Sequence, residues 1–148
     1  MPRIFVFGSN LAGRHGKGAA LDARLNYGAI SGRGEGLQGA SYAIPTKDHA
    51  LRPLPLEAIE RHVRRFLLFA EQHPELVFEV TPIGCGLAGY KPEQIAPMFK
   101  LISNNVLLPP AFQTVIDATT GLATWLAVAA EADPELHDLA EAFKRIKP

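Results

Sequence analysis

The chain has 148 residues, no formal net charge at pH 7 and 47% hydrophobic residues, so we treat residues 1–148 as one globular domain. Because lysine and arginine form no long run, charge alone gives no reason to expect binding to long nucleic acid. The single cysteine excludes an internal disulfide and a cysteine-based zinc site. No HExxH-like spacing is present, and we therefore expect neither a metal nor a cofactor.

The first residues, Pro2 and Arg3, lead directly into fold-forming sequence without the pattern of a secretory signal. No apolar run reaches the length of a membrane span. We therefore expect a cytoplasmic protein with no membrane partner. The sequence leaves the oligomeric state open.

A strand predicted over Arg3–Phe7 runs into a glycine-rich loop, and a helix over about Gly18–Tyr27 follows. Four glycines fall within eleven residues of this region: Gly8, Gly13, Gly16 and Gly18. Since such a loop carries little side chain, its backbone N–H groups can face an anion, and the helix dipole favours one there. Arg14 and Lys17 are either additional cations for that anion or solvated loop residues.

A loop over Gly28–Gly39, a strand over about Ser41–Pro45 and the loop TKDHALRPLP come next. The first of these loops holds five glycines, too many for a helix, and is too long for a plain turn. It is either a surface excursion or a flap over a ligand. A helix over about Leu56–His73 follows, because apolar residues recur there at spacings of three and four: Ile59, Val63, Phe66, Leu67 and Ala70.

A strand predicted over Leu76–Pro82 runs into a second glycine-rich loop, and Pro92 suits the first turn of a helix that ends near Ser103. A strand, a glycine loop and a helix N-terminus together form a common phosphate site. The alternative is that these glycines only make a tight turn. Two such loops in one small domain favour a ligand held at two places, such as the two phosphates of a diphosphate. The glycines of the second loop are Gly84, Gly86 and Gly89.

The last predicted strand covers Gln113–Asp117, and the part from Gly121 is expected to form two helical pieces packed on the domain, with a break at Asp133-Pro134. This alternation of strands and helices predicts a three-layer α/β domain, with helices on both faces of a mostly parallel sheet. Ligands of such sheets bind at the carboxyl ends of the strands. Both glycine loops and the TKD segment leave strands at that edge, so we expect all three to meet in one crevice.

These motifs resemble those of the macrodomain family. An early strand, asparagine and glycine-rich loop are followed by IPTKD (Ile44–Asp48), an amphipathic helix and IGCGL (Ile83–Leu87). The ordered set is similar to the branch that includes terminal ADP-ribose–protein glycohydrolase, and the resemblance covers about residues 3–117. It implies a macrodomain-like α/β/α fold and an ADP-ribosyl hydrolase, whose partner is ADP-ribose or an ADP-ribosylated target.

The resemblance also implies roles for individual residues. Asn10 stands where macrodomains keep an asparagine that faces the ribose beside the scissile bond, and Lys47 where this branch carries a lysine that attacks the anomeric carbon. Tyr90 is a candidate lid over the distal ribose, or else a rim aromatic. The ligand-binding residues that we expect are Gly8, Ser9, Asn10, Gly16, Lys17, Gly18, Ala19, Thr46, Gly84, Cys85, Gly86, Leu87, Ala88, Gly89 and Tyr90.

The chain departs from this branch at one important position. The branch has an aspartate directly after IGCGL, whereas this chain has Ala88, whose methyl group cannot act as a general base. Asp48 beside Lys47 is the candidate substitute, although adjacent residues of an extended segment point in opposite directions. The candidate catalytic residues are therefore Lys47, Asn10 and Asp48.

Other functions stay open beside hydrolysis. One is an ADP-ribose-binding module without catalysis. Another is a hydrolase in which Cys85 is the nucleophile, since a thiol between two glycines at a helix N-terminus can be activated, with His15 or His49 as base. The last is an interaction protein that keeps the fold with a degenerate pocket.

Overall fold

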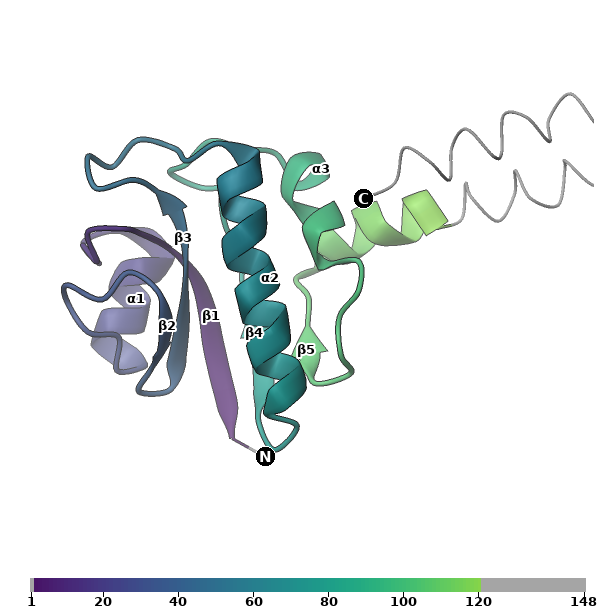
Figure 1. Ribbon diagram of the computed structural model, residues 1–148, viewed down its shortest axis with the longest axis horizontal. Helices are drawn as coiled ribbons and strands as arrows, with labels where there is room; N and C mark the ends of the chain where they lie inside the picture. The colour runs from purple at the N-terminus through teal and green to yellow at the C-terminus, as the bar shows by residue number, and fades with distance from the viewer. Residues whose placement is uncertain (1, 121–148) are drawn as a thin grey trace, which may run out of the picture.

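The computed structural model describes residues 2–120, which form a five-stranded, mostly parallel mixed sheet with helices packed on it (Figure 1). The elements in chain order are β1 (Arg3–Asn10), α1 (Gly18–Asn26), β2 (Gly36–Gln38), β3 (Ser41–Lys47), α2 (Leu56–Gln72), β4 (Val77–Val80), α3 (Pro92–Ile95), the 3-10 helix η1 (Ala96–Phe99) and β5 (Val106–Leu107). A further helix begins at residue 110 and continues to residue 120.

The sheet has the strand order β2-β3-β1-β4-β5, with β1 at its centre. β1 runs parallel to both β3 and β4, and β5 runs parallel to β4, whereas β2 pairs antiparallel with β3. The carboxyl ends of β1, β3 and β4 therefore lie at one edge. The predicted α/β class with a mostly parallel sheet is confirmed by this arrangement.

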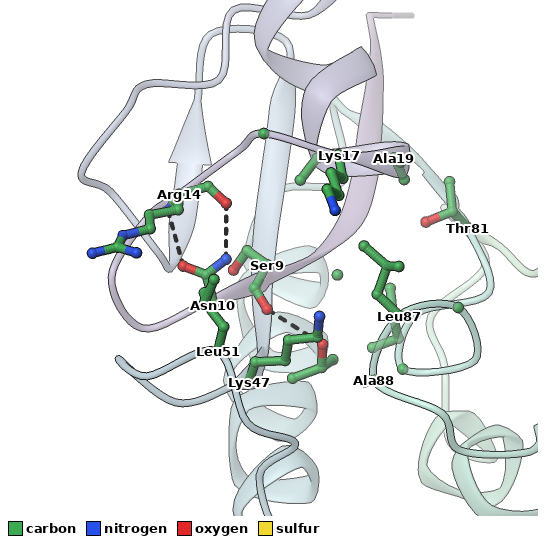
Figure 2. Close-up of a pocket in the computed structure, with 18 of the residues that line it drawn as sticks. Ser9, Asn10, Arg14, Lys17, Ala19, Lys47, Leu51, Thr81, Leu87 and Ala88 are labelled. Atoms are coloured by element: carbon green, nitrogen blue, oxygen red, sulfur yellow. Dashed lines mark hydrogen bonds between the residues drawn. The ribbon is translucent and has the colours of Figure 1, made fainter.

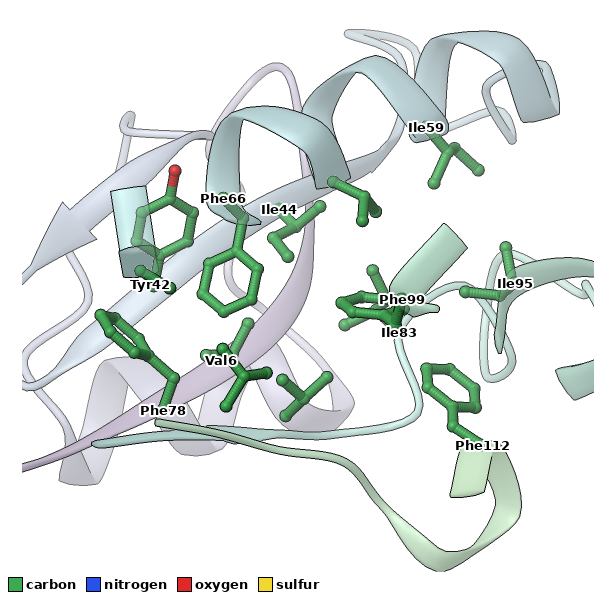
Figure 3. Packing of buried hydrophobic residues seen from close by; sticks show 14 of the residues in the cluster. Val6, Tyr42, Ile44, Ile59, Phe66, Phe78, Ile83, Ile95, Phe99 and Phe112 are labelled. Atoms are coloured by element: carbon green, nitrogen blue, oxygen red, sulfur yellow. The ribbon is translucent and has the colours of Figure 1, made fainter. Parts of the chain in front are cut away.

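Successive residues of β1 pack in different apolar clusters. Val6 belongs to the main apolar cluster with the buried face of α2, whereas Phe7 belongs to a smaller cluster with Ala20 and Ala23 of α1. Figure 3 shows the main cluster, in which the ring of Phe66 packs against neighbouring aromatic and aliphatic side chains. The residues that α2 buries are Ile59, Val63, Phe66 and Ala70, which follow the predicted spacing. Burial of these side chains fixes α2 along the sheet (Figure 1).

The prediction of a strand over Gln113–Asp117 is wrong, because these residues lie inside the helix over 110–120. Phe112 is fully buried and Val115 and Ile116 pack beside it, which is helical spacing. Pro109 and Pro110 favour a helix start at this point, and the N–H groups of Phe112 and Gln113 both donate to the Pro109 carbonyl.

The fourth parallel strand is instead β5, which lies between the helix predicted to end near Ser103 and the strand predicted from Gln113. Asn105 fixes the start of this strand, since its Nδ2 lies 2.9, 3.0 and 3.1 Å from the carbonyl oxygens of Ala70, His73 and Leu76. The buried asparagine thus ties β5 to the end of α2 and the turn after it.

The helix expected from Pro92 to near Ser103 is shorter and changes type. α3 ends at Ile95 and η1 continues to Phe99, because Pro97 has no N–H to donate within an α-helix. The two helical pieces expected after Gly121 lie outside the described residues. No helix within residues 2–120 has the length and apolar character needed to span a membrane.

Candidate functional site

A cavity of about 520 Å³ lies where β1, β3 and β4 end. Both glycine loops and the end of β3 line it, so the segments expected to converge at this edge of the sheet do meet. The expected site residues that line it are Gly8, Ser9, Asn10, Gly16, Lys17, Gly18, Ala19, Thr46, Lys47, Gly84, Gly86, Leu87 and Ala88.

The lining carries positive charge without a compensating carboxylate. Arg14, Lys17 and Lys47 line the cavity, and no aspartate or glutamate of the described part of the chain does. Figure 2 shows the amino groups of Lys17 and Lys47 directed towards the space beside Leu87, whereas the Arg14 guanidinium points away from it. A cavity of this composition favours an anionic ligand.

The first glycine loop ends at the N-terminus of α1, which has no side-chain cap. Gly18, Ala19 and Ala20 form its first turn, so their N–H groups have no acceptor within the helix, and all three residues line the cavity. Because the nine-residue helix also directs its positive dipole end here, this wall of the cavity is suited to an anion.

The second glycine loop folds back on itself after β4. Gly84 adopts φ 74° and Gly89 φ 83°, and the Tyr90 N–H donates to the Gly84 carbonyl at 2.8 Å. Within residues 2–120, the N–H groups of Gly86, Leu87 and Ala88 have no hydrogen-bond acceptor. These three residues line the cavity, so the second loop offers donors opposite those of the first.

Asn10 supports the first loop with both ends of its side-chain amide. Its Nδ2 donates to the Arg14 carbonyl at 2.8 Å, and its Oδ1 accepts from the Arg14 N–H at 2.9 Å (Figure 2). The hydroxyls of Ser9, Thr46 and Thr81 likewise donate to backbone carbonyls. These side chains therefore hold the shape of the cavity, and the protons of the three hydroxyls are already donated to the backbone.

Four expected site residues do not line the cavity: Asp48, Cys85, Gly89 and Tyr90. The Tyr90 hydroxyl donates instead to the Leu54 carbonyl, which keeps the ring beside the main apolar cluster. The Gly89 N–H closes the turn by donating to the Gly86 carbonyl at 3.0 Å. Tyr90, the candidate lid over the ribose, therefore lies outside the lining and holds the end of the second loop against the main apolar cluster.

The Asp48 carboxylate caps its own turn. Its Oδ1 accepts from the N–H groups of Ala50 and Arg52 at 2.8 and 2.9 Å. The Arg52 N–H is the main cause that lowers the pKa of Asp48 below its ordinary value, with Ala50 adding to it. An ionised carboxylate held in this way is a structural acceptor and does not face the cavity.

Cys85 is half-buried and lies outside the lining. Burial raises the pKa of its thiol, and the Glu93 carboxylate raises it further. The thiol therefore stays protonated at neutral pH, whereas a cysteine nucleophile needs a lowered pKa. This environment argues against catalysis by Cys85.

The Gly28–Gly39 segment lies behind the first glycine loop, and none of its residues lines the cavity. A Cβ added to Gly34 would come within 2.2 Å of the Asn10 carbonyl oxygen, and one added to Gly13 within 2.3 Å of the Gly32 carbonyl carbon. His15 joins the two segments, with Nε2 at 3.1 Å from the carbonyl oxygens of both Ile30 and Arg33. The segment therefore supports the loop from behind and does not cover a ligand as a flap.

Sequence reasoning missed several lining residues. Arg14, for which the sequence leaves open a role as an additional cation for the anion, is in the lining, and so are Leu51, Thr81 and Pro82, which are not among the expected site residues. Thr81 and Pro82 directly follow β4, so their place at the carboxyl edge of the sheet was a usable signal. Nothing in the sequence indicated Leu51. The remaining lining residues are Ala20 and Ile83.

Comparison with known proteins gave no match: no protein-family model, no curated protein and no solved structure matches this chain. Within residues 2–120, no three His, Cys, Asp or Glu side chains are grouped so that they could hold a metal ion.

Replacing Gly34 by alanine tests the packing behind the first loop. The new methyl group would overlap the Asn10 carbonyl oxygen, so we expect Gly34→Ala to lower the free energy of unfolding by about 1–3 kcal/mol. Urea unfolding measures this loss. Gly16→Ala is the control, because a Cβ there meets no atom within 4 Å. Equal stability of the two variants would contradict the close approach.

Proposed function

We propose that this protein binds ADP-ribose or a related NAD-derived nucleotide and removes ADP-ribose from a modified target. The observation that carries the proposal is one cavity lined by two separate glycine loops with unpaired N–H groups, together with the amines of Lys17 and Lys47 and no carboxylate of the described chain. A diphosphate has two negatively charged groups, so each loop would hold one of them.

The size and outline of the cavity suit such a ligand. A volume of about 520 Å³ lies within the usual range for pockets that bind small molecules. The apolar side chains of Leu51, Leu87 and Ala88 line the cavity beside the backbone of the glycine loops, which suits a ligand of sugars and bases joined by phosphates.

The macrodomain resemblance is consistent with this assignment. We assign to the chain a three-layer α/β/α macrodomain-like architecture, supported by the packing of α1 and α2 against successive residues of the central strand. In that assignment the two loops are the phosphate loops. Asn10 and Lys47 then lie at the end of the ligand where the distal ribose carries its attached group.

Hydrolysis in this proposal depends on Lys47. Among the described residues the cavity offers no carboxylate, and the nearby hydroxyls already donate to the backbone. Two lining amines remain, those of Lys17 and Lys47. Lys17 belongs to the first phosphate loop, so we assign to Lys47 the attack on the anomeric carbon of the distal ribose, which expels the attached group before water releases ADP-ribose. The missing carboxylate equally favours the second candidate, a module that binds ADP-ribose without turnover.

Gly86→Glu tests the phosphate role of the second loop. A Cβ at Gly86 meets no atom within 4 Å and the residue needs no positive φ, so the variant should fold normally. A carboxylate there would repel the phosphate, and we expect affinity for ADP-ribose to fall by more than about 100-fold. Calorimetric titration measures this change. Gly86→Ala, the uncharged control, should bind nearly as the wild type does, and normal binding by Gly86→Glu would exclude the loop as a phosphate site.

Lys47→Arg and Lys47→Ala separate binding from turnover. Arginine keeps the positive charge but is never deprotonated, so it cannot act as the nucleophile. We expect Lys47→Arg to bind ADP-ribose almost normally, while release of ADP-ribose from an ADP-ribosylated protein falls by at least about 100-fold in both variants.

The wild-type control decides between the two candidates. Turnover by Lys47→Arg at the wild-type rate would exclude Lys47 as the nucleophile. Normal ADP-ribose binding by the wild type without any turnover on protein or nucleic-acid targets would support the second candidate, a module that binds without catalysis.

A further inference from the structure

Leu51 has an unusual backbone conformation for a leucine. Its φ is 64°, and it is the only non-glycine residue with a positive φ within residues 2–120. This left-handed region disfavours residues that carry a Cβ, and a glycine at this position would be free of that cost. The surrounding turn must therefore hold Leu51 in place.

The turn fixes this conformation through a dense set of hydrogen bonds. Besides the two bonds to the Asp48 carboxylate, the Leu51 N–H donates to the Asp48 carbonyl at 3.1 Å, and the Asp48 N–H donates to the Arg52 carbonyl at 2.8 Å. Lys47 and Pro53 form an antiparallel bridge at the base of the turn. These hydrogen bonds therefore fix the backbone from which the Leu51 side chain extends before any ligand binds.

The Leu51 side chain gains little stabilisation from burial within the protein. Leu51 is 40% exposed and belongs to neither apolar cluster. It lines the cavity, and Figure 2 shows it on the side where Asn10 and Lys47 lie. A strained backbone that places an exposed apolar group in a cationic cavity indicates a contact with the ligand.

We propose that Leu51 is a specificity-determining residue, which packs against the sugar beyond the diphosphate and so selects nucleoside-diphosphate sugars over nucleoside diphosphates. This assignment rests on the proposed function, in which the Asn10 and Lys47 end receives the distal ribose. The apolar face of that ribose would cover the exposed part of Leu51, and the phosphates would bind elsewhere, at the glycine loops.

A comparison of two ligands with two variants tests the contact. ADP lacks the distal ribose, so calorimetric titration with ADP-ribose and with ADP isolates the contribution of that sugar. We expect Leu51→Ala and Leu51→Gly to lower the affinity for ADP-ribose by about tenfold and the affinity for ADP by less than about twofold. Leu68→Ala, which truncates an exposed leucine of α2 outside the cavity, is the control and should change neither affinity.

Thermal unfolding verifies that both variants are folded and tests the strain. Leu51→Gly relieves the strain of the left-handed backbone and Leu51→Ala does not, so the glycine variant should melt about 2–4 °C above the alanine variant.

Unchanged ADP-ribose binding by both variants, or an equal loss of affinity for ADP and ADP-ribose, would overturn the contact and leave the proposed function standing. If the wild type bound neither ligand, the proposed function itself would fail.

Discussion

The site depends on close approach between backbone segments at the carboxyl end of β1. Gly34 lies against the Asn10 carbonyl, and Gly13 lies against the peptide that joins Gly32 and Arg33, at distances that admit no side chain. The same strand end turns directly into the loop that reaches α1. The Gly28–Gly39 segment supports that loop from behind, so the loop that lines the cavity is held by contacts within the protein. Preorganised donors of this kind bind an anion with less loss of conformational entropy.

Electrostatics then determines what the cavity accepts. Its hydroxyls donate to backbone carbonyls, the Asp48 carboxylate beside Lys47 in the sequence caps a turn, and within residues 2–120 its cations have no acidic partner in the lining. The groups left to meet a ligand are thus N–H donors, amines and a few apolar side chains. This set suits phosphate and sugar, and among the described residues the side chains that it offers for acid–base chemistry are the amines of Lys17 and Lys47. Binding follows from the arrangement more directly than turnover does, because turnover needs a single side chain to do all of the chemistry.

Much of this arrangement could be predicted from the sequence, because it is encoded by local patterns. Alternating strands and helices indicated the α/β class, and the glycine loops indicated where N–H groups would gather. The strand predicted over Gln113–Asp117 is a helix, because the start at Pro109-Pro110 and the burial of Phe112 with Val115 and Ile116 at helical spacing determine the structure there in spite of the β-branched residues. The role of the Gly28–Gly39 segment could not be foreseen, since it depends on contacts with residues that are distant in the sequence. The left-handed Leu51 likewise arises from a hydrogen-bonded turn and leaves no compositional signal.

The most direct test of the account is calorimetric titration of the wild-type protein with ADP-ribose, with AMP and NAD as comparisons. If each loop holds one phosphate, we expect a dissociation constant near 1 μM for ADP-ribose, which corresponds to a binding free energy of about −8 kcal/mol. AMP has a single phosphate and should bind markedly more weakly. No binding of any of the three, or AMP bound as tightly as ADP-ribose, would contradict the two-loop diphosphate site.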